Sequence, residues 1–124
     1  MPALSVIICT HRPRREHLAA TLAGLAAQTL PVADWELLLV GTGDAETARR
    51  VAEFDLAWHP HVRLIDQPHE GIARSRRRGL QEFVAGTSDV MVFIDDDNVL
   101  APDYLARGLA IGAREPRLGC WADN

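Results

Sequence analysis

The chain has 124 residues, of which 48% are hydrophobic and 24% are charged, a composition typical of one folded globular domain rather than of a disordered chain. All 13 basic residues are arginine, which excludes mechanisms that need a lysine, such as Schiff-base chemistry or a phosphate-binding loop ending in Gly-Lys. The formal net charge of -4 provides no overall basic field for nucleic acid.

No stretch has the features of a signal peptide or of a membrane span, because no apolar run approaches the required length of roughly 18 residues. We therefore expect one domain over residues 1–124, located in the cytoplasm or peripheral to a membrane. Cys9 and Cys120 are too few and too far apart for a disulfide scaffold or a zinc motif, so both are expected to be buried free thiols.

Short apolar runs alternate with helical repeats along the whole chain. The runs predict strands over residues 4–9, 35–40, 61–65 and 90–94. The repeats, several with a proline or an aspartate near their start, predict helices over residues 13–28, 44–54, 71–85 and 101–115. This alternation predicts an α/β fold with a mostly parallel sheet and helices on both faces, and ligands of such sheets bind beyond the carboxyl ends of the strands.

Two local features of this pattern lead to further expectations. Gly41 and Gly43 should break the second strand after Val40. The apolar stripe of the third helix should face the sheet, and it consists of Ile72, Leu80, Phe83 and Val84.

Three consecutive aspartates follow the fourth expected strand, namely Asp95, Asp96 and Asp97. Because alternate side chains of an extended chain share a face, Asp95 and Asp97 are expected on one side, about 7 Å apart, and Asp96 on the other. A divalent cation would relieve the repulsion between such close charges. Carboxylates without nearby His or Cys favour Mg²⁺ or Mn²⁺, which usually complete their coordination with substrate phosphates. The alternative is a solvated acidic turn.

Thr10 and His11 follow the first strand, which in the usual order lies beside the fourth, so they are expected to face the aspartates. Their alternative role is in the turn and cap of the following helix. Arg76 falls on the expected sheet-facing stripe of the third helix, where a guanidinium needs a partner. Two interpretations stay open for it: an ion pair with an acid such as Asp95, or contact with a bound anion or base.

Three stretches of the chain resemble the family 2 glycosyltransferases, whose nucleotide-binding half is the first part of a GT-A fold. They are "LSVIICTHRPRREHLAATLAGLAAQTLP" at residues 4–31, "HEGIARSRRRGL" at 69–80 and "DVMVFIDDDNVLAPDYL" at 89–105. The resemblance implies a Rossmann-like GT-A fold in an incomplete domain. It also implies inverting transfer of a sugar from a nucleotide diphosphate to an unidentified acceptor, with a UDP-sugar as the favoured donor.

Carried over by position, the resemblance assigns a role to each of the residues at the strand ends. It implies that Thr10 and His11 line the pocket for the base and that Arg76 helps to hold the base. It further implies Asp96 near the ribose. Asp97 would bind the Mn²⁺ or Mg²⁺ ion that bridges the diphosphate, together with Asp95 as the first acid of the motif.

The chain departs from the family pattern in two respects. Gly41 and Thr42 stand where the family usually has aspartates, so a carboxylate contact to the base or ribose is missing, and Asp44 is the nearest acid that could replace it. No residue matches the general base that inverting transfer requires, so no catalytic residue is assigned. The chain is therefore expected to be a donor-binding half.

Other functions compete with this interpretation. A non-catalytic module that holds a nucleotide sugar without transfer is the main alternative. A phosphatase of the haloacid dehalogenase type fits "VFIDDDNV" only locally, since the chain has no lysine for its later phosphate contact. A dinucleotide fingerprint is excluded by Glu46, which stands in place of its third glycine, and a receiver domain lacks its acids and lysine.

An apolar edge and Trp121 near the end of the sequence predict self-association of the chain.

Overall fold

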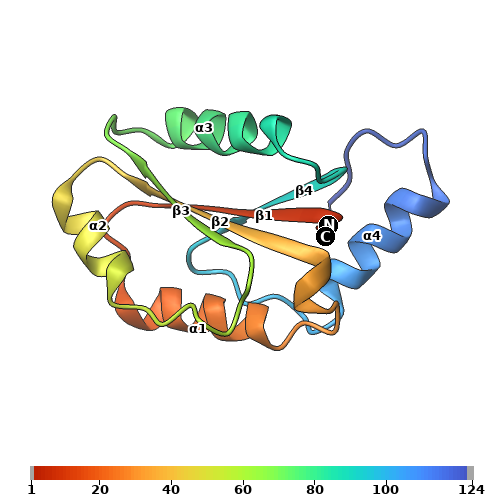
Figure 1. Cartoon of the computed structure of the whole chain (residues 1–124), viewed down its shortest axis with the longest axis horizontal. Helices are drawn as coiled ribbons and strands as arrows, with labels where there is room; N and C mark the ends of the chain where they lie inside the picture. The colour runs from red at the N-terminus through yellow and green to blue at the C-terminus, as the bar shows by residue number, and fades with distance from the viewer. Residues whose placement is uncertain (1, 123–124) are drawn as a thin grey trace.

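The computed structural model describes residues 2–122 and contains all four expected strands and all four expected helices (Figure 1). The strands are β1 (Leu4–Thr10), β2 (Trp35–Thr42), β3 (Val62–Gln67) and β4 (Val90–Asp95). The helices are α1 (Arg15–Ala26), α2 (Ala45–Ala52), α3 (Ile72–Ala85) and α4 (Tyr104–Arg114), with a single 3-10 turn, η1 (Val32–Asp34), before β2.

The four strands form one parallel sheet in the order β3-β2-β1-β4. The chain steps outward from β1 to β3 and then crosses back to place β4 on the other side of β1. This reversal brings the carboxyl ends of β1 and β4 next to each other, with Cys9 in register with Asp95. Such a reversal is where open α/β sheets bind their ligands, so the site is expected at this edge.

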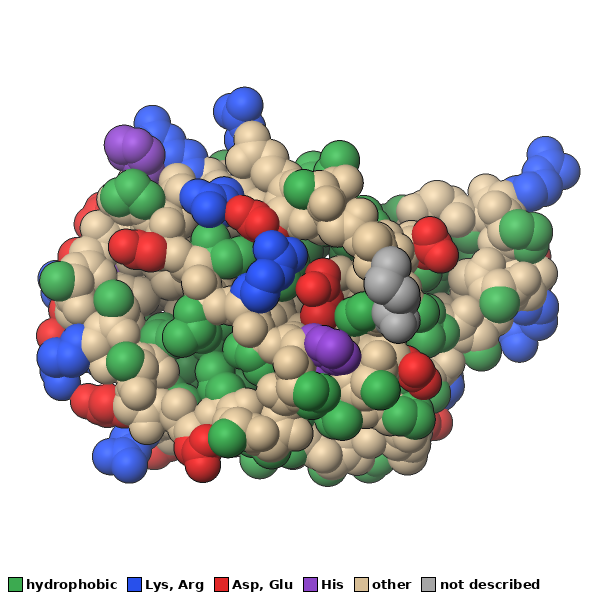
Figure 2. All heavy atoms as spheres, in the orientation of Figure 1, with side chains coloured by type: hydrophobic (Ala, Val, Ile, Leu, Met, Phe, Trp, Pro, Cys, Tyr) green, Lys and Arg blue, Asp and Glu red, His purple; other side chains and the backbone are tan. Residues whose placement is uncertain are grey.

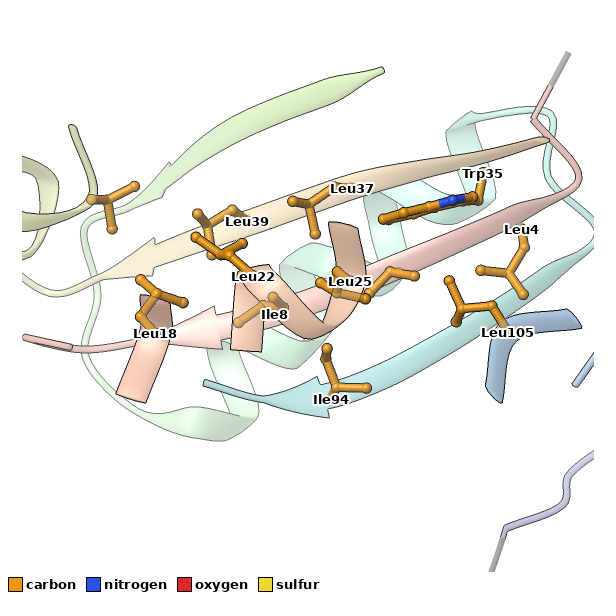
Figure 3. Close-up of a cluster of buried hydrophobic side chains, with 12 residues drawn as sticks. Leu4, Ile8, Leu18, Leu22, Leu25, Trp35, Leu37, Leu39, Ile94 and Leu105 are labelled. Atoms are coloured by element: carbon orange, nitrogen blue, oxygen red, sulfur yellow. The ribbon is translucent and has the colours of Figure 1, made fainter. Parts of the chain in front are cut away.

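Large aliphatic side chains fill the space between the sheet and α1. Leu18, Leu22 and Leu25 repeat along one side of α1 and are at most 5% exposed. They meet Val6, Ile8 and other inward-facing strand residues, and the end of the sheet near Leu4 is closed by Trp35 and Leu105 (Figure 3). Burial of a leucine side chain contributes about 1.5–3 kcal/mol, so this layer is the main apolar core.

The other face of the sheet is covered by α3 (Figure 1). The expected orientation of this helix is confirmed for Phe83, which packs against a buried cluster of strand residues on this face, and is wrong for the rest of the apolar stripe. Its large apolar residues Ile72, Leu80 and Val84 are 55%, 41% and 72% exposed. The fully buried residues of α3 are Ser75 and Gly79, and a Cβ on Gly79 would lie 2.6 Å from Ile7 Cγ2. Small side chains let α3 approach β1 closely, while Ile72, Leu80 and Val84 are left toward solvent.

Three further expectations need correction. Gly41 does not end β2, which continues through Gly41 to Thr42. The expected burial of both thiols fails at Cys120, which is exposed, whereas Cys9 is half-buried. Trp121 is only half-exposed, because its ring lies against α4, 3.1 Å from the position that a Cβ on Gly112 would take.

The described residues include no helix that is long and apolar enough to cross a membrane. Figure 2 shows acidic and basic side chains interspersed over the face that it presents, without a patch of one sign. Phe93 on β4, an edge strand of the sheet, is 39% exposed. Self-association through this edge stays a prediction.

Candidate functional site

Asp96 is held in place by two threonines from different elements. Thr10 Oγ1, at the end of β1, donates a hydrogen bond of 2.6 Å to Asp96 Oδ2. Thr21 Oγ1, on α1, donates a bond of 2.9 Å to the main-chain oxygen of Asp96. The expected proximity of Thr10 to the acidic triplet is therefore confirmed.

The expected arrangement of Asp95 and Asp97 on one face is wrong, because the chain stops being extended at Asp95. Asn98 closes a turn there: its Oδ1 accepts from Asp95 N at 2.9 Å, and its N donates to Asp95 O at 3.3 Å. Asp96 and Asp97 lie in this turn, so strand alternation does not apply to them. The Asp97 side chain is exposed and has no hydrogen bond or ion pair with any residue of 2–122.

Arg76 reaches the acids from α3, although it does not lie on the buried side of that helix. Its side chain is 51% exposed, and its Nη2 lies 3.7 Å from Asp95 Oδ1. The contact with Asp95 is as expected, but the burial is not. An exposed pair of this kind contributes little to stability, so the Arg76 guanidinium is available to a ligand.

A pocket of about 260 Å³ opens at the carboxyl ends of β1 and β2, beneath the first turn of α3. His11 lies at its edge, with Nδ1 2.8 Å from Thr42 O. Ligand pockets range from about 300 to 1,000 Å³, so this space fits one ring system of a ligand rather than a whole nucleotide sugar. The lining residues are Cys9, Thr10, His11, Thr42, Glu70, Gly71, Ile72 and Ser75.

Thr42 occupies the position where the family pattern has an aspartate, and its hydroxyl is used to hold α3. It forms a hydrogen bond with Ser75 Oγ, which also donates to Gly71 O at 3.2 Å. Both Thr42 and Ser75 are at most 4% exposed. Gly71 has a φ of 114°, a conformation that favours glycine, and it turns the chain from β3 into α3 at the pocket wall.

Asp44 does not replace the missing aspartate, because its carboxylate serves two other partners and does not line the pocket. It accepts from Arg12 Nη2 at 2.7 Å, and its Oδ1 caps α2 by accepting from Thr47 N at 3.0 Å. The hydrogen bond from Arg12, followed by the one from Thr47, lowers the pKa of Asp44 to about 2. Asp44 is thus a capping residue.

Glu70 was given no role from the sequence, yet it lies in the pocket wall. Its side chain packs beside Gly43, where an added Cβ would lie 3.0 Å from Glu70 Cγ and 3.0 Å from His11 Nδ1. Its carboxylate has no hydrogen bond or ion pair with another described residue. The signal that could have pointed to Glu70 is its place in the loop after β3, at the carboxyl edge of the sheet. The turn at Gly71 that directs its side chain could not be foreseen.

Cys9 forms part of the pocket wall as a thiol. Burial raises its pKa to about 11, and the nearby Arg76 opposes this only in part. A thiol with this pKa remains protonated at neutral pH, which makes it a poor nucleophile and a weak hydrogen-bond donor.

A protein-only metal cage is absent from residues 2–122, since no group of three or more His, Cys, Asp or Glu side chains is arranged to hold an ion. Mg²⁺ and similar ions usually take one or two carboxylates and complete their shell with water and substrate phosphates. The exposed carboxylates of Asp95 and Asp97 at the β4 turn fit that mode.

The Glycosyl transferase family 2 model matches residues 5–120, nearly the whole chain. The chain belongs to this family. Among curated relatives of this family 2 domain is the succinoglycan biosynthesis protein ExoM of Rhizobium meliloti, 31% identical over 112 residues that make up 84% of this chain and 33% of ExoM. Another is a glucosyl-dolichyl phosphate glucuronosyltransferase of Haloferax volcanii, 32% identical over 82% of this chain and 31% of that protein.

Solved structures share the fold of the family 2 domain. TarS 1-349 of S. aureus, in complex with UDP-GlcNAc, aligns with a TM-score of 0.78 at 18% identity, over 94% of this chain and 32% of that one. The mannosyltransferase PcManGT of Pyrobaculum calidifontis, in complex with GDP-Man and Mn²⁺, aligns with a TM-score of 0.74 at 22% identity, over 90% and 32%. The expected α/β, GT-A type of sheet is confirmed. The chain spans about a third of the length of the curated relatives named above.

Proposed function

We propose that this chain forms a single nucleotide-sugar-binding domain over residues 1–124 and binds the donor of a glycosyltransferase. The observation that carries the proposal is the convergence of a pocket and an acidic turn at one sheet edge, where Thr10 joins them through its hydrogen bond to Asp96. The pocket is suited to one ring system, such as the base of a nucleoside diphosphate. The exposed carboxylates beside it are suited to the diphosphate end, through a metal ion. Family membership supports the same activity.

The base of the donor would enter the pocket between β1 and α3. Thr10 and His11 form one side of this pocket, and Arg76 extends from α3 toward Asp95 at its mouth. Asp96 has its Oδ2 bonded to Thr10, so its Oδ1 is the oxygen left for a ribose hydroxyl. A nucleoside carries both hydrogen-bond donors and acceptors, so it can pair with each of these side chains.

Asp97, with Asp95, would hold a Mn²⁺ or Mg²⁺ ion shared with the diphosphate of the donor. Such an ion neutralises the charge that develops on the leaving diphosphate. Two facts support the assignment: Asp97 is exposed without a partner among residues 2–122, and Asp95 is exposed beside it in the chain. The mannosyltransferase PcManGT, which shares the fold, is a precedent because its structure is a complex with GDP-Man and Mn²⁺.

Transfer itself would invert the configuration of the sugar, as the resemblance implies, and needs a base at the acceptor hydroxyl. None of the described residues is assigned this role. Binding of the donor without transfer is therefore the second candidate function, and the two are separated by measuring turnover as well as binding.

Calorimetry with nucleoside diphosphates, with and without MnCl₂, tests the proposal. We expect metal-dependent binding that Asp97→Asn weakens by roughly tenfold or more, since a lost charged contact costs about 1.5–3 kcal/mol. Asp89→Asn, an exposed acid at the amino end of the same strand, is the matched control and should bind as the parent does. Equal, metal-independent binding by the parent and Asp97→Asn would show that the assignment is wrong.

A further inference from the structure

The hydroxyl groups of the pocket already donate their hydrogens to hydrogen bonds within the protein. Thr10 Oγ1 donates to the carboxylate of Asp96, and a carboxylate can only accept. Ser75 Oγ donates to the main-chain oxygen of Gly71, which likewise can only accept. The hydroxyl of Thr42, bonded to Ser75, must then direct its own hydrogen at Ser75 Oγ. Each of these hydroxyls therefore offers only lone pairs to a ligand.

Neutral His11 likewise offers a ligand only a hydrogen-bond acceptor. Its Nδ1 lies 2.8 Å from Thr42 O, a carbonyl oxygen, so Nδ1 carries the ring hydrogen and donates it there. Nε2 is then the unprotonated nitrogen and accepts. The main-chain contact thus fixes which tautomer the pocket contains.

Glu70 adds the strongest acceptor in the wall. Its two carboxylate oxygens have no hydrogen-bond or ion-pair partner within the described chain. Arg12, whose charge interacts with Glu70, is already bonded to Asp44, with Nε and Nη2 at 2.9 and 2.7 Å from Asp44 Oδ2. The carboxylate of Glu70 is therefore free to take two donors from a ligand.

We propose that this pocket selects guanine, so that the donor is a sugar linked to guanosine diphosphate. Guanine carries two adjacent donor groups, N1–H and the N2 amino group, which match the two oxygens of the Glu70 carboxylate in a bidentate pair. Uracil carries one N–H between two carbonyl oxygens, so it can donate to only one oxygen of the Glu70 carboxylate. Adenine and cytosine each place a ring-nitrogen acceptor beside their amino group, so they satisfy only one carboxylate oxygen.

This inference rests on the proposed function and names the base that the same site takes. It differs from the uridine donor expected from the sequence, because the sequence does not reveal which way each hydrogen bond runs. Among the side chains that line the pocket, Cys9, which remains a thiol, is the only one with a hydrogen left for a ligand, and it is a weak donor. The Arg76 guanidinium lies outside this lining.

Competition between bases tests the inference on the whole chain. Calorimetry with GDP, UDP, CDP and ADP in MnCl₂ should give a dissociation constant for GDP that is roughly 10- to 100-fold lower than for the others, as expected for a charged hydrogen-bond pair. UDP binding as tightly as GDP, or tighter, would overturn the guanine assignment and leave the proposed function standing. Absence of binding by all four would overturn both.

Glu70→Gln sharpens the test, because glutamine keeps the shape of the side chain but turns one of its two acceptors into a donor. We expect GDP binding to weaken by roughly tenfold while UDP binding is unchanged or improved, so that the GDP:UDP ratio falls. Glu115→Gln, at an exposed position after α4, is the matched control and should keep the ratio. A ratio that is unchanged in Glu70→Gln, or that falls equally in both variants, would overturn the role of Glu70.

Discussion

The two faces of the sheet are packed in different ways. On the α1 face, Leu18 and its neighbours at helical spacing belong to a layer of large buried apolar side chains. On the α3 face, Phe83 packs on a smaller apolar cluster, and the closest contact is made by Ser75 and Gly79, with a hydroxyl pair at the end near the pocket. The face that follows simple hydrophobic patterning builds the core, and the face that departs from it carries the candidate site.

The largest expected effect tests the apolar face. Leu18→Ala removes a fully buried side chain and should lower the free energy of unfolding by about 2–5 kcal/mol, because a cavity remains. Leu80→Ala on α3, where the leucine is 41% exposed, should cost less than about 1 kcal/mol. Urea denaturation of both variants measures the contrast, and equal losses would mean that Leu80 is packed as tightly as Leu18.

The hydroxyl pair of the α3 face comes next. Ser75→Ala leaves the buried Thr42 hydroxyl without its partner and should cost about 1–3 kcal/mol. Adding Thr42→Val removes the hydroxyl that Ser75→Ala leaves without a hydrogen-bond partner. The double variant should therefore be more stable than Ser75→Ala alone. A thermodynamic cycle over the four proteins gives the coupling, and strict additivity would contradict the bond.

The close approach of α3 to β1 is tested at its glycine. Gly79→Ala places a methyl group 2.6 Å from Ile7 Cγ2, and overpacking of this kind should cost about 1–2 kcal/mol after the gain in helix propensity. Gly108→Ala in α4 is the control, because its added Cβ would have no described atom within 4 Å apart from its chain neighbours and its own helix backbone. That control should gain about 0.5–1 kcal/mol in stability. Stabilisation by both substitutions would show that α3 can move away from β1 without cost.

The smallest effect is a pH dependence that arises on the apolar side. His59 is 4% exposed, its Nδ1 accepts from His61 N at 2.9 Å, and its ring lies 4.2 Å from that of Trp35. Burial, followed by the charge of His61, lowers the pKa of His59 to about 4. Protonation would also require a hydrogen on Nδ1, which breaks the bond from His61.

Because the unfolded chain takes up this proton near its ordinary pKa of about 6.5 and the folded chain only near pH 4, stability is lost as the pH falls from 7 to 6. The loss in that window should be under about 1 kcal/mol. It should disappear in His59→Phe when urea midpoints at the two pH values are compared. The same loss in the variant would assign it to another group.

The sequence was sufficient to predict the elements and their order, because each strand is a compact apolar run and each helix has a clear start. The α1 leucines also revealed their buried side, since their period is that of a helix on a flat sheet. The same rule fails for α3. The contact of Gly79 with Ile7 depends on two segments far apart in the chain, and a helical pattern of large residues cannot report it.

The site was predicted in its location and in part of its membership. Thr10 and Asp96 meet as expected because the strands have the usual order of such a sheet, with the first strand beside the fourth. The turn at Asn98 was not foreseen, since it depends on a side chain bonding to its own neighbouring main chain. Glu70 was missed for a related reason, because its direction is set by the backbone at Gly71.

The two threonines on Asp96 have a consequence for the affinity of whatever binds there. A free aspartate on a loop samples several rotamers, and a ligand that needs one of them must freeze the others out. Here β1 and α1 have already selected the rotamer and fixed the loop backbone beneath it. The conformational entropy of the Asp96 side chain is already lost when the chain folds. Ordering this carboxylate therefore does not weaken the binding of a ligand.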